Sequence, residues 1–342
     1  MKFNIFIPDL LTETKLEKKI LGNKYNIILS SKDKFENLSD NFFSKIHGIM
    51  TGHHVKFDKK KIKKLKKCKI IVRYGVGFDN VDIKQCGLQN IKVFNVPDYG
   101  VDEVADHALG LILDLSRYLT ANDLNLREQL KTNKIHWKYD LNKNQIRLKK
   151  LNLGIIGLGR IGTALSLRSK NIFNKVLFYD PNLPDGIEKS LSLIRMESVS
   201  NLFKNSDIIS VHVPSSSENK FFLKDALFKN IKKKIIFINT SRGDLVKNSI
   251  LSKYFERGKI SALGLDVFEK EPIKIDDPLI KIWLNPKNIG KIIFSPHNAF
   301  YSKQSLFEIR FKALKTLKKY FETGNVKNCI NKSYFRINFF TN

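Results

Sequence analysis

Residues 151–162 read LNLGIIGLGRIG, and this stretch decides the fold. A short apolar run is followed at once by Gly157, Gly159 and Gly162, where a helical pattern opens. A buried strand that turns through glycines into a helix begins a βαβ unit, whose two strands lie parallel in one sheet. Similar apolar runs alternate with helical patterns along most of the chain, so we predict an α/β protein.

The three glycines have the spacing of a dinucleotide-binding turn. Gly157 would permit the tight turn, Gly159 would let the backbone approach a pyrophosphate, and Gly162 would allow the helix to pack closely on the strand. The main-chain N–H groups of Arg160 and Ile161 would then face the phosphate charge at the helix N-terminus. The sequence therefore predicts a dinucleotide site after the strand at 152–156.

The next predicted strand, 175–179, is followed by Asp180. A carboxylate in this place accepts hydrogen bonds from the ribose hydroxyls and repels a 2′-phosphate. No arginine follows in the segment 181–183, so we expect NAD rather than NADP as the cofactor. A glycine turn and an acid that occur together by coincidence are the less favoured interpretation, because strand, turn, helix and acid come in order.

The remaining predicted elements suggest two domains. The clearest strands are 4–7, 70–73, 152–156, 175–179, 208–211, 234–238 and 292–295, and long helical patterns cover 101–117 and 302–323. The turn-rich segment 95–100 marks one crossing between domains, and a second is expected at 295–296. With 342 residues the chain has room for two domains, at roughly 100–200 residues each.

Composition narrows the class of protein. Hydrophobic residues make up 42% and charged residues 27%, which is typical of a folded globular chain rather than a disordered one. No apolar stretch is long enough for a membrane span, and no signal peptide is evident, so we expect a cytoplasmic protein. Cys68, Cys86 and Cys329 lie far apart without metal-ligand spacing, so we expect reduced thiols and no metal site.

The net charge of +28 raises the alternative of a nucleic-acid binder. The basic residues are mostly lysines spread over the whole chain, which is a weak signal for that function. The densest run, KKKIKKLKKCK at 59–69, places Ile62 and Leu65 at helical spacing and predicts an amphipathic helix with a solvated lysine face. We therefore do not expect nucleic-acid binding, which would be strongly salt-dependent, to be the main function.

Three later segments carry residue types suited to the reduction of a 2-keto acid: NTSRGDLV at 239–246, LDVFEKEP at 265–272 and SPHNAF at 295–300. The guanidinium of Arg242 can bind a carboxylate through two parallel hydrogen bonds, one to each oxygen. The imidazole of His297 can donate a proton to the nascent alkoxide, and a carboxylate such as Glu271 favours the imidazolium. Each of the three residues taken alone could instead have a structural role.

These segments also carry a family likeness. The sequence resembles the D-isomer-specific 2-hydroxyacid dehydrogenases and, within them, the branch that includes the C-terminal binding proteins. GLGRIG, NTSRG, DVFEKEP and the Pro-His pair before Asn298 resemble the signatures of the family. The branch is indicated by IVRYGVGFDNVDI at 71–83, VPDYGVDEVADHA at 96–108, YDPNLPDG at 179–186 and VKNCINK at 326–332.

The resemblance implies roles for individual residues. Arg242 corresponds to the substrate arginine, His297 to the acid/base and Glu271 to its partner. The implied cofactor contacts are Asp266 at the nicotinamide carboxamide, Thr240 at the nicotinamide ribose, and His212, Val213 and Pro214 on the adenine side. The implied further substrate ligands are Arg73, for which a structural ion pair is the alternative, and the backbone of Gly75, Val76 and Gly77.

The resemblance further implies an architecture and a partner. Residues 1–100 and 296–342 would form a flavodoxin-like substrate domain, into which a Rossmann NAD-binding domain, 101–295, is inserted. The family likeness implies a homodimer that uses a helix at about 101–117. Two functions stay open: an NAD-dependent D-2-hydroxyacid dehydrogenase, and an NAD-sensing corepressor-like protein. Phe300 replaces a tryptophan of the corepressors, which leaves the small 2-keto or 2-hydroxy acid substrate unidentified.

Overall fold

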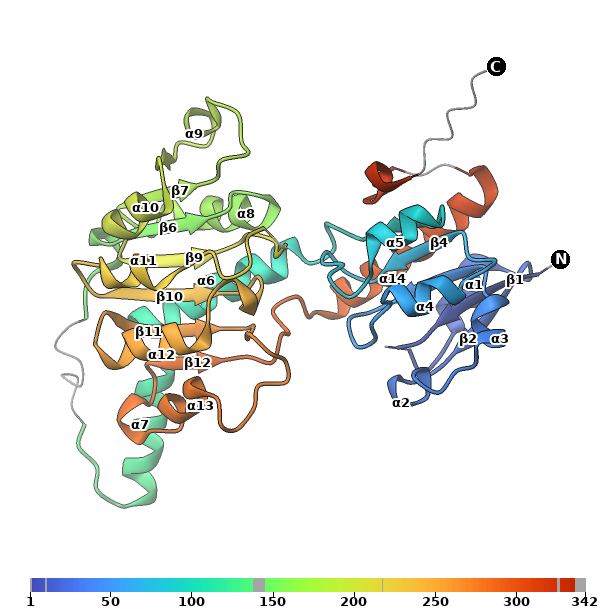
Figure 1. Ribbon diagram of the computed structural model, residues 1–342. Helices are drawn as coiled ribbons and strands as arrows, with labels where there is room; N and C mark the ends of the chain where they lie inside the picture. The colour runs from blue at the N-terminus through green and yellow to red at the C-terminus, as the bar shows by residue number, and fades with distance from the viewer. Residues whose placement is uncertain (1, 10, 138–144, 217, 325–326, 336–342) are drawn as a thin grey trace. The chain divides into compact units, whose positions relative to one another are not determined.

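The computed structural model describes residues 2–9, 11–137, 145–216, 218–324 and 327–335. The chain divides into two compact units, which Figure 1 shows as two separate sheets with their helices. Unit 1 comprises Met1–Tyr99 and Ser302–Asn342, and unit 2 comprises Gly100–Tyr301.

Unit 2 is built on a seven-stranded parallel sheet in the order β12-β11-β10-β9-β6-β7-β8. This is the Rossmann order with one extra strand at the end. All ladders are parallel, so every strand ends at the same edge of the sheet. The strands are β6 (Asn152–Ile156), β7 (Lys175–Tyr179), β8 (Ile194–Arg195), β9 (Ile208–Val211), β10 (Ile235–Asn239), β11 (Ile260–Leu265) and β12 (Ile292–Phe294).

Helices cover both faces of this sheet, which is why its central strands are apolar on both sides. On one face lie α6 (Val101–Arg117) and α8 (Arg160–Ser169), and on the other lie α10 (Val199–Asn205), α11 (Asp225–Lys229), α12 (Asn248–Glu256) and α13 (Pro278–Trp283). The remaining helices of unit 2 are α7 (Leu119–Lys131), α9 (Ile187–Ser190), and the 3-10 turns η1 (Leu148–Lys150), η2 (Gly243–Leu245) and η3 (Pro286–Asn288).

Unit 1 has a five-stranded parallel sheet in the order β2-β1-β3-β4-β5, the order of flavodoxin. Its strands are β1 (Phe3–Ile7), β2 (Tyr25–Leu29), β3 (Gly48–Thr51), β4 (Ile70–Arg73) and β5 (Lys92–Phe94). One face packs against α1 (Lys15–Leu21) and α14 (Lys303–Thr323), and the other against α2 (Lys32–Phe35), α3 (Asp40–Ser44), α4 (Lys59–Lys64) and α5 (Ile83–Leu88). The 3-10 turn η4 (Lys332–Tyr334) packs on α5.

The expected α/β fold is confirmed, and the predicted strands agree with the observed ones to within one residue at either end. Five strands were not predicted: β2, β3, β5, β8 and β11. Three of these are four residues or shorter, β2 is a half-exposed edge strand, and β11 reads ISALGL, whose small residues do not form an apolar run. The helix from Ser302 is confirmed, with Ser302 as its N-cap.

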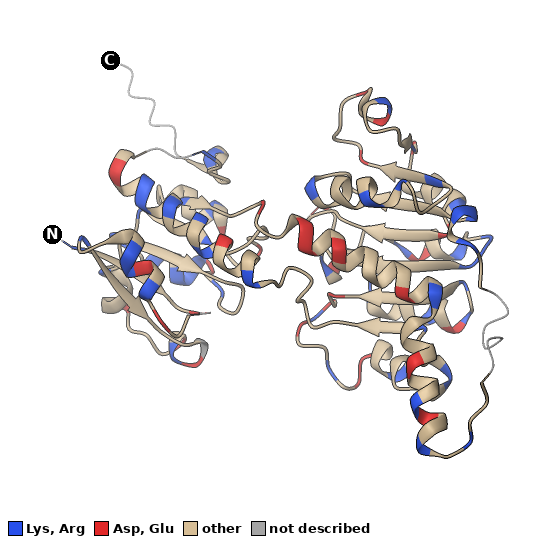
Figure 2. Ribbon diagram, turned by 180° about the vertical axis from the view of Figure 1, so that it is seen from behind, with Lys and Arg blue, Asp and Glu red and all other residues tan. Residues whose placement is uncertain are grey.

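The helix expected over 59–69 is shorter than predicted. It ends at Lys64, because the chain turns at Leu65 to enter β4 at Ile70. Ile62 and Leu65 are both buried, as the amphipathic pattern indicated. Lysines and arginines occur over both units, interspersed with acidic residues (Figure 2). None of the described helices combines the length and the hydropathy that crossing a membrane requires.

The segment after α14 is bonded to the chain around β5 through a buried side-chain amide. In VKNCINK, Val326 lies outside the described residues, but Asn331 is fully buried. Its amide nitrogen donates to the carbonyl of Ile91 at 2.9 Å, and its amide oxygen accepts the N–H of Val93 at 2.9 Å. The side chain thus takes the place of a further strand partner beside β5, which explains why a polar residue occupies this position.

A buried ion pair joins the two ends of unit 1. Glu17 of α1 is fully buried, and both of its carboxylate oxygens accept hydrogen bonds from Arg310 of α14, at 3.0 and 2.9 Å. The fork geometry matches the two oxygens of the carboxylate and makes each bond stronger than one between neutral groups. The C-terminal helix is therefore tied to the first helix of the chain.

We predict that Arg310→Met destabilises unit 1 by about 3–5 kcal/mol, because it leaves the Glu17 carboxylate buried without its cation. Lys312→Met is the matched control, since Lys312 on the same helix pairs with the exposed Asp98. Its cost should stay below about 1 kcal/mol. Urea unfolding of the full chain measures both values, and equal costs for the two variants would contradict the assignment.

Candidate active site

The turn after β6 depends on the absence of side chains at two glycines. Gly157 has a φ of +88°, and a Cβ there would lie 2.6 Å from the Val213 side chain and 2.9 Å from the carbonyl oxygen of His212. A Cβ on Gly162 would lie 2.1 Å from the carbonyl oxygen of Gly157. Both positions therefore require glycine for packing.

Gly159 is different, since a Cβ there would meet no atom within 4 Å and its φ is −71°. Nothing in the described part of the chain requires glycine at this position. The residue is the N-cap of α8, whose first N–H groups, including those of Arg160 and Ile161, have no acceptor within the helix. A glycine that leaves open space beside such N–H groups suits the close approach of a phosphate.

Asp180 lies where β7 ends and is bonded to the glycine turn. Its Oδ2 accepts the N–H of Leu158 at 2.9 Å, and its Oδ1 accepts the N–H of Asn182 at 3.0 Å. Each carboxylate oxygen keeps one further acceptor direction. The acid predicted to read the ribose is thus held beside the turn predicted to bind the pyrophosphate.

Two of the buried polar atoms that have no hydrogen-bond partner among the described residues belong to residues that directly follow strands of this sheet. One is Oγ1 of Thr240, directly after β10, and the other is Nδ1 of His212, directly after β9. Burial lowers the pKa of His212 to about 4, so the ring is neutral at physiological pH. Its Nε2 lies 2.8 Å from Oγ of Ser210.

These features fit a dinucleotide. The glycine turn follows β6 and His212 follows β9, and these neighbouring strands form the point where the strand order reverses. Ligands of open parallel sheets bind at this point, beyond the carboxyl ends of the strands. Buried polar groups without a protein partner are uncommon, and a bound cofactor would supply the missing partners of Thr240 and His212. Val213 and Pro214 continue the same loop.

The loop that carries Arg242 is fixed by the preceding asparagine. The side-chain oxygen of Asn239 accepts the N–H and the hydroxyl of Ser241, at 3.0 and 2.8 Å, and its amide nitrogen donates to the carbonyl of Arg242 at 2.8 Å. A Cβ on Gly243 would lie 1.9 Å from the carbonyl carbon of Phe268. Gly243 therefore allows the arginine loop to pack against the loop that follows β11.

Asp266 holds the segment that contains His297. Its side chain is almost fully buried, and its Oδ1 accepts the Ser295 hydroxyl at 2.6 Å and the N–H of Asn298 at 3.0 Å. Its Oδ2 accepts the N–H of Ala299 at 3.1 Å. The N–H of His297 donates to the carbonyl of Asp266 at 2.8 Å, and His297 has a φ of +52°.

These bonds also explain where unit 2 ends. Residues 296–301 belong to unit 2, to which His297, Asn298 and Ala299 are tied by hydrogen bonds to Asp266, and the crossing to unit 1 falls between Tyr301 and Ser302 rather than at the expected 295–296. The first crossing falls between Tyr99 and Gly100.

His297 and Glu271 form a close pair, with 2.6 Å between the imidazole Nδ1 and the carboxylate Oε2. Oε1 of Glu271 accepts the N–H of Phe268 at 3.0 Å. Burial raises the pKa of Glu271, but the hydrogen bond and charge of His297, the Phe268 N–H and the charge of Arg242 outweigh it and lower the pKa below its ordinary value. Arg242, Glu271 and His297 therefore form one electrostatic cluster, with Glu271 ionised at neutral pH.

Of the predicted substrate residues, Arg73 ends β4, and Gly75, Val76 and Gly77 follow it at the carboxyl edge of the unit 1 sheet. Arg73 is mostly buried, and its Nη1 donates to the carbonyl of Tyr74. Gly75 has a φ of +137°, and a Cβ there would overlap the guanidinium of Arg73. The glycine thus makes room for the arginine, which explains why the two occur together.

Two residues that hold this site were not singled out in the sequence. Asn239 ends the buried strand β10, and a polar side chain at the end of a buried strand is a usable signal. His107 of α6 was not recognised, and its Nε2 lies 2.9 Å from the hydroxyl of Ser295, which bonds to Asp266. No local pattern could have paired residues this far apart in the sequence.

Comparison with known proteins identifies the family. A family model described as D-isomer specific 2-hydroxyacid dehydrogenase, NAD binding domain, matches residues 109–299, more than half of the chain. The chain belongs to this family. It is thus an oxidoreductase of the D-2-hydroxyacid dehydrogenase family whose Rossmann unit is an NAD-binding domain.

Similar proteins include several members of this family. A glyoxylate reductase of Korarchaeum cryptofilum is 33% identical over 245 residues, which cover 70% of this chain and 69% of the relative. C-terminal-binding protein 1 of Caenorhabditis elegans is 27% identical over 94% of this chain, which spans 44% of that protein. The crystal structure of D-lactate dehydrogenase from Aquifex aeolicus, complexed with NAD and lactic acid, has a TM-score of 0.81 at 27% identity and covers 93% of this chain and 96% of that one.

The two glycines of the turn should respond differently to substitution. Gly162→Ala should destabilise unit 2 by about 2–4 kcal/mol, since its Cβ collides with main-chain atoms that cannot move aside. Gly159→Ala, where the space is open, should leave the free energy of unfolding within about 0.5 kcal/mol of the wild type. Denaturant unfolding without added nucleotide measures both variants. A stable Gly162→Ala protein would show that the helix is not packed on the turn as described.

Proposed function

We propose that this protein interconverts a D-2-hydroxy acid and its 2-keto acid by hydride transfer, with NAD as the cofactor. The observation that carries the proposal is the cluster of Arg242, Glu271 and His297 in the same unit as the dinucleotide turn. Bound NADH supplies the hydride, and the protein supplies the charge and the proton that the keto acid needs. The glyoxylate reductase and lactate dehydrogenase among the similar proteins support a small acid as the substrate.

Each residue of the cluster has a distinct task in the proposal. The guanidinium of Arg242 binds the substrate carboxylate, since a planar fork matches its two oxygens. The imidazolium of His297 donates a proton to the carbonyl oxygen as that oxygen gains negative charge. Glu271 accepts from Nδ1 of His297, which fixes the ring and leaves Nε2 as the atom that gives up the proton.

The remaining site residues are proposed on the resemblance to the family together with the contacts above. Asp180 binds the ribose hydroxyls and sets the preference for NAD over NADP, Thr240 and His212 supply buried acceptors and donors, and Asp266 serves the carboxamide in addition to holding the His297 segment. The proposed further substrate ligands are Arg73 and the turn formed by Gly75, Val76 and Gly77.

We also propose that the chain belongs to the C-terminal-binding-protein-like branch, which the 27% identity over 94% of the chain supports. The hydrogen-bonded His297–Glu271 pair favours the dehydrogenase over a corepressor-like sensor of NAD, which would need cofactor binding but not this pair. Phe300 in place of the tryptophan of the corepressors is consistent with a different substrate.

The direct test is oxidation of NADH by glyoxylate, pyruvate and hydroxypyruvate, with the chirality of each product determined. We expect at least one D-2-hydroxy acid to form, and we expect His297→Ala to lower kcat by about 100-fold or more, because the proton donor is lost. Tight NADH binding without turnover of any keto acid would instead support the sensor.

Glu271→Gln serves as the control that separates proton donation from folding. The substitution keeps the shape of the side chain but removes the negative charge that favours the imidazolium. The pH at which keto acid reduction falls to half its maximum should therefore move to lower pH than in the wild type. An unchanged pH profile with lower kcat would mean that Glu271 does not act through His297.

We further propose that the protein is a homodimer. The helix expected to form the interface, α6, buries seven of its 17 residues within unit 2 and leaves the others accessible, and none of the residues of the following helix, α7, is buried. Leu119, Leu124 and Leu130 of α7 are 59%, 44% and 57% exposed, and Trp137 beyond it is 84% exposed. Large apolar residues gathered on one segment are typical of a protein interface.

Leu124→Glu combined with Leu130→Glu should convert the dimer to a monomer, since each charge would be buried without a partner. Ile275→Glu, at a residue 81% exposed elsewhere in unit 2, should leave the dimer intact. Light scattering coupled to size exclusion gives the mass in each case. A monomeric wild type at micromolar concentration would rule out this proposal.

A further inference from the structure

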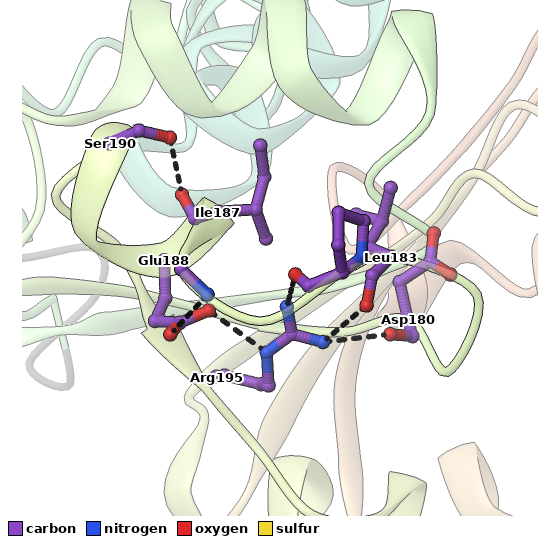
Figure 3. Close-up of polar contacts among 8 residues, drawn as sticks. Asp180, Leu183, Ile187, Glu188, Ser190 and Arg195 are labelled. Atoms are coloured by element: carbon purple, nitrogen blue, oxygen red, sulfur yellow. Dashed lines mark hydrogen bonds and ion pairs between the residues drawn. The ribbon is translucent and has the colours of Figure 1, made fainter.

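The guanidinium of Arg195, at the end of β8, forms hydrogen bonds with several residues of the loop that follows β7 (Figure 3). Its Nη1 donates to the carbonyls of Asp180 and Leu183, both at 3.3 Å, and its Nη2 donates to the carbonyl of Pro184 at 2.6 Å. Its Nε donates to Oε2 of Glu188 at 3.0 Å. One side chain thus binds three main-chain carbonyls and one carboxylate of a single loop.

The guanidinium is itself held in place. It lies over the ring of Phe178 with 5.1 Å to the ring centroid, and Phe178 is a fully buried residue of β7. The Arg195 side chain is 24% exposed. The second oxygen of Glu188 accepts the N–H of Gly186 at 3.0 Å, so the carboxylate also has a fixed orientation. The loop is therefore anchored to the sheet through Arg195.

The same loop begins at the residue proposed to read the ribose. The carboxylate of Asp180 accepts from Leu158 in the glycine turn, and the carbonyl of Asp180 accepts from Arg195. Because a side chain can adopt only the directions its main chain permits, the position of the Asp180 carboxylate depends on the loop conformation. Arg195 determines that conformation from a site 15 residues further along the chain.

We propose that Arg195 is a positioning residue for the adenosine end of the cofactor, acting through the 180–188 loop. This inference rests on the proposed function, since it presupposes that Asp180 binds the ribose. A guanidinium has five N–H groups, and Arg195 makes four contacts with the 180–188 loop. Its role is therefore to shape the loop rather than to attract the phosphates of the cofactor as a point charge.

The test compares Arg195→Met and Arg195→Lys with the wild type, using calorimetric binding of ADP-ribose and NADH. ADP-ribose lacks the nicotinamide and so reports on the adenosine and pyrophosphate end alone. We expect Arg195→Met to weaken both ligands about tenfold or more, because three carbonyls lose their shared donor. The factor by which the KM for NADH rises should exceed the factor by which kcat at saturating NADH falls. A general loss of structure would not produce this difference.

Arg195→Lys separates loop geometry from charge. A lysine keeps the positive charge but cannot bridge four acceptors with a planar fork, so its affinities should fall between those of the wild type and Arg195→Met. If Arg195→Lys bound ADP-ribose and NADH with the affinities of the wild type, the proposal would be overturned in favour of simple charge attraction. Arg257→Met is the matched control, because Arg257 also lies over an aromatic ring of unit 2, that of Tyr254, at 5.9 Å. Its affinities should equal those of the wild type.

Glu188→Gln covers the case in which Arg195→Met does not fold. It removes the charged partner of Nε but leaves the three carbonyl contacts, so ADP-ribose should bind more weakly than in the wild type and fold stability should be largely retained. Wild-type ADP-ribose affinity in every folded Arg195 and Glu188 variant would overturn the inference while leaving the proposed function intact. A wild-type protein that binds neither NADH nor ADP-ribose would overturn both.

Discussion

Unit 2 is organised around the close contact between Gly162 and the carbonyl of Gly157, where no side-chain carbon can fit. This contact brings the start of α8 directly over the end of β6, with the N–H groups of its first turn facing the carboxyl edge of the sheet. Because every ladder in unit 2 is parallel, the ends of β7, β9, β10, β11 and β12 lie along that same edge. The candidate site residues of unit 2 follow from this alignment.

Along that edge, buried acids and amides set the loops in place. Asp266 accepts three hydrogen bonds from the segment around His297, and Asn239 makes three within the loop of Arg242. A hydrogen bond to a charged group contributes about 1.5–3 kcal/mol, so the Asp266 bonds can hold His297 at a positive φ. Glu271, which is more exposed than Asp266, faces the imidazole and remains ionised there. Similar acids thus serve different tasks because their surroundings differ.

Much of the fold and of the candidate site could be predicted from the sequence because the signals are local. A glycine turn, a strand that ends in an acid and an apolar run each span a few residues, and the strands they predicted were found. The strands that were missed lack such signals: β11 reads ISALGL, and β8 has only two residues. The lysine helix was predicted too long because lysine is compatible with a helix at every position of 59–69, while the entry into β4 is a tertiary requirement.

By itself the sequence determined the α/β class, the glycine turn after β6 and the residue types of the candidate active site, because the backbone and the chemistry demand those residues at those spacings. Only the tertiary structure decided which side chains meet. The pairing of Glu271 with His297, the use of Asp266 and Ser295 to hold the histidine segment, and the contacts of Arg195 all join residues from separate loops or strands. Such contacts arise when parallel strands align their ends, and no spacing within one segment can encode them.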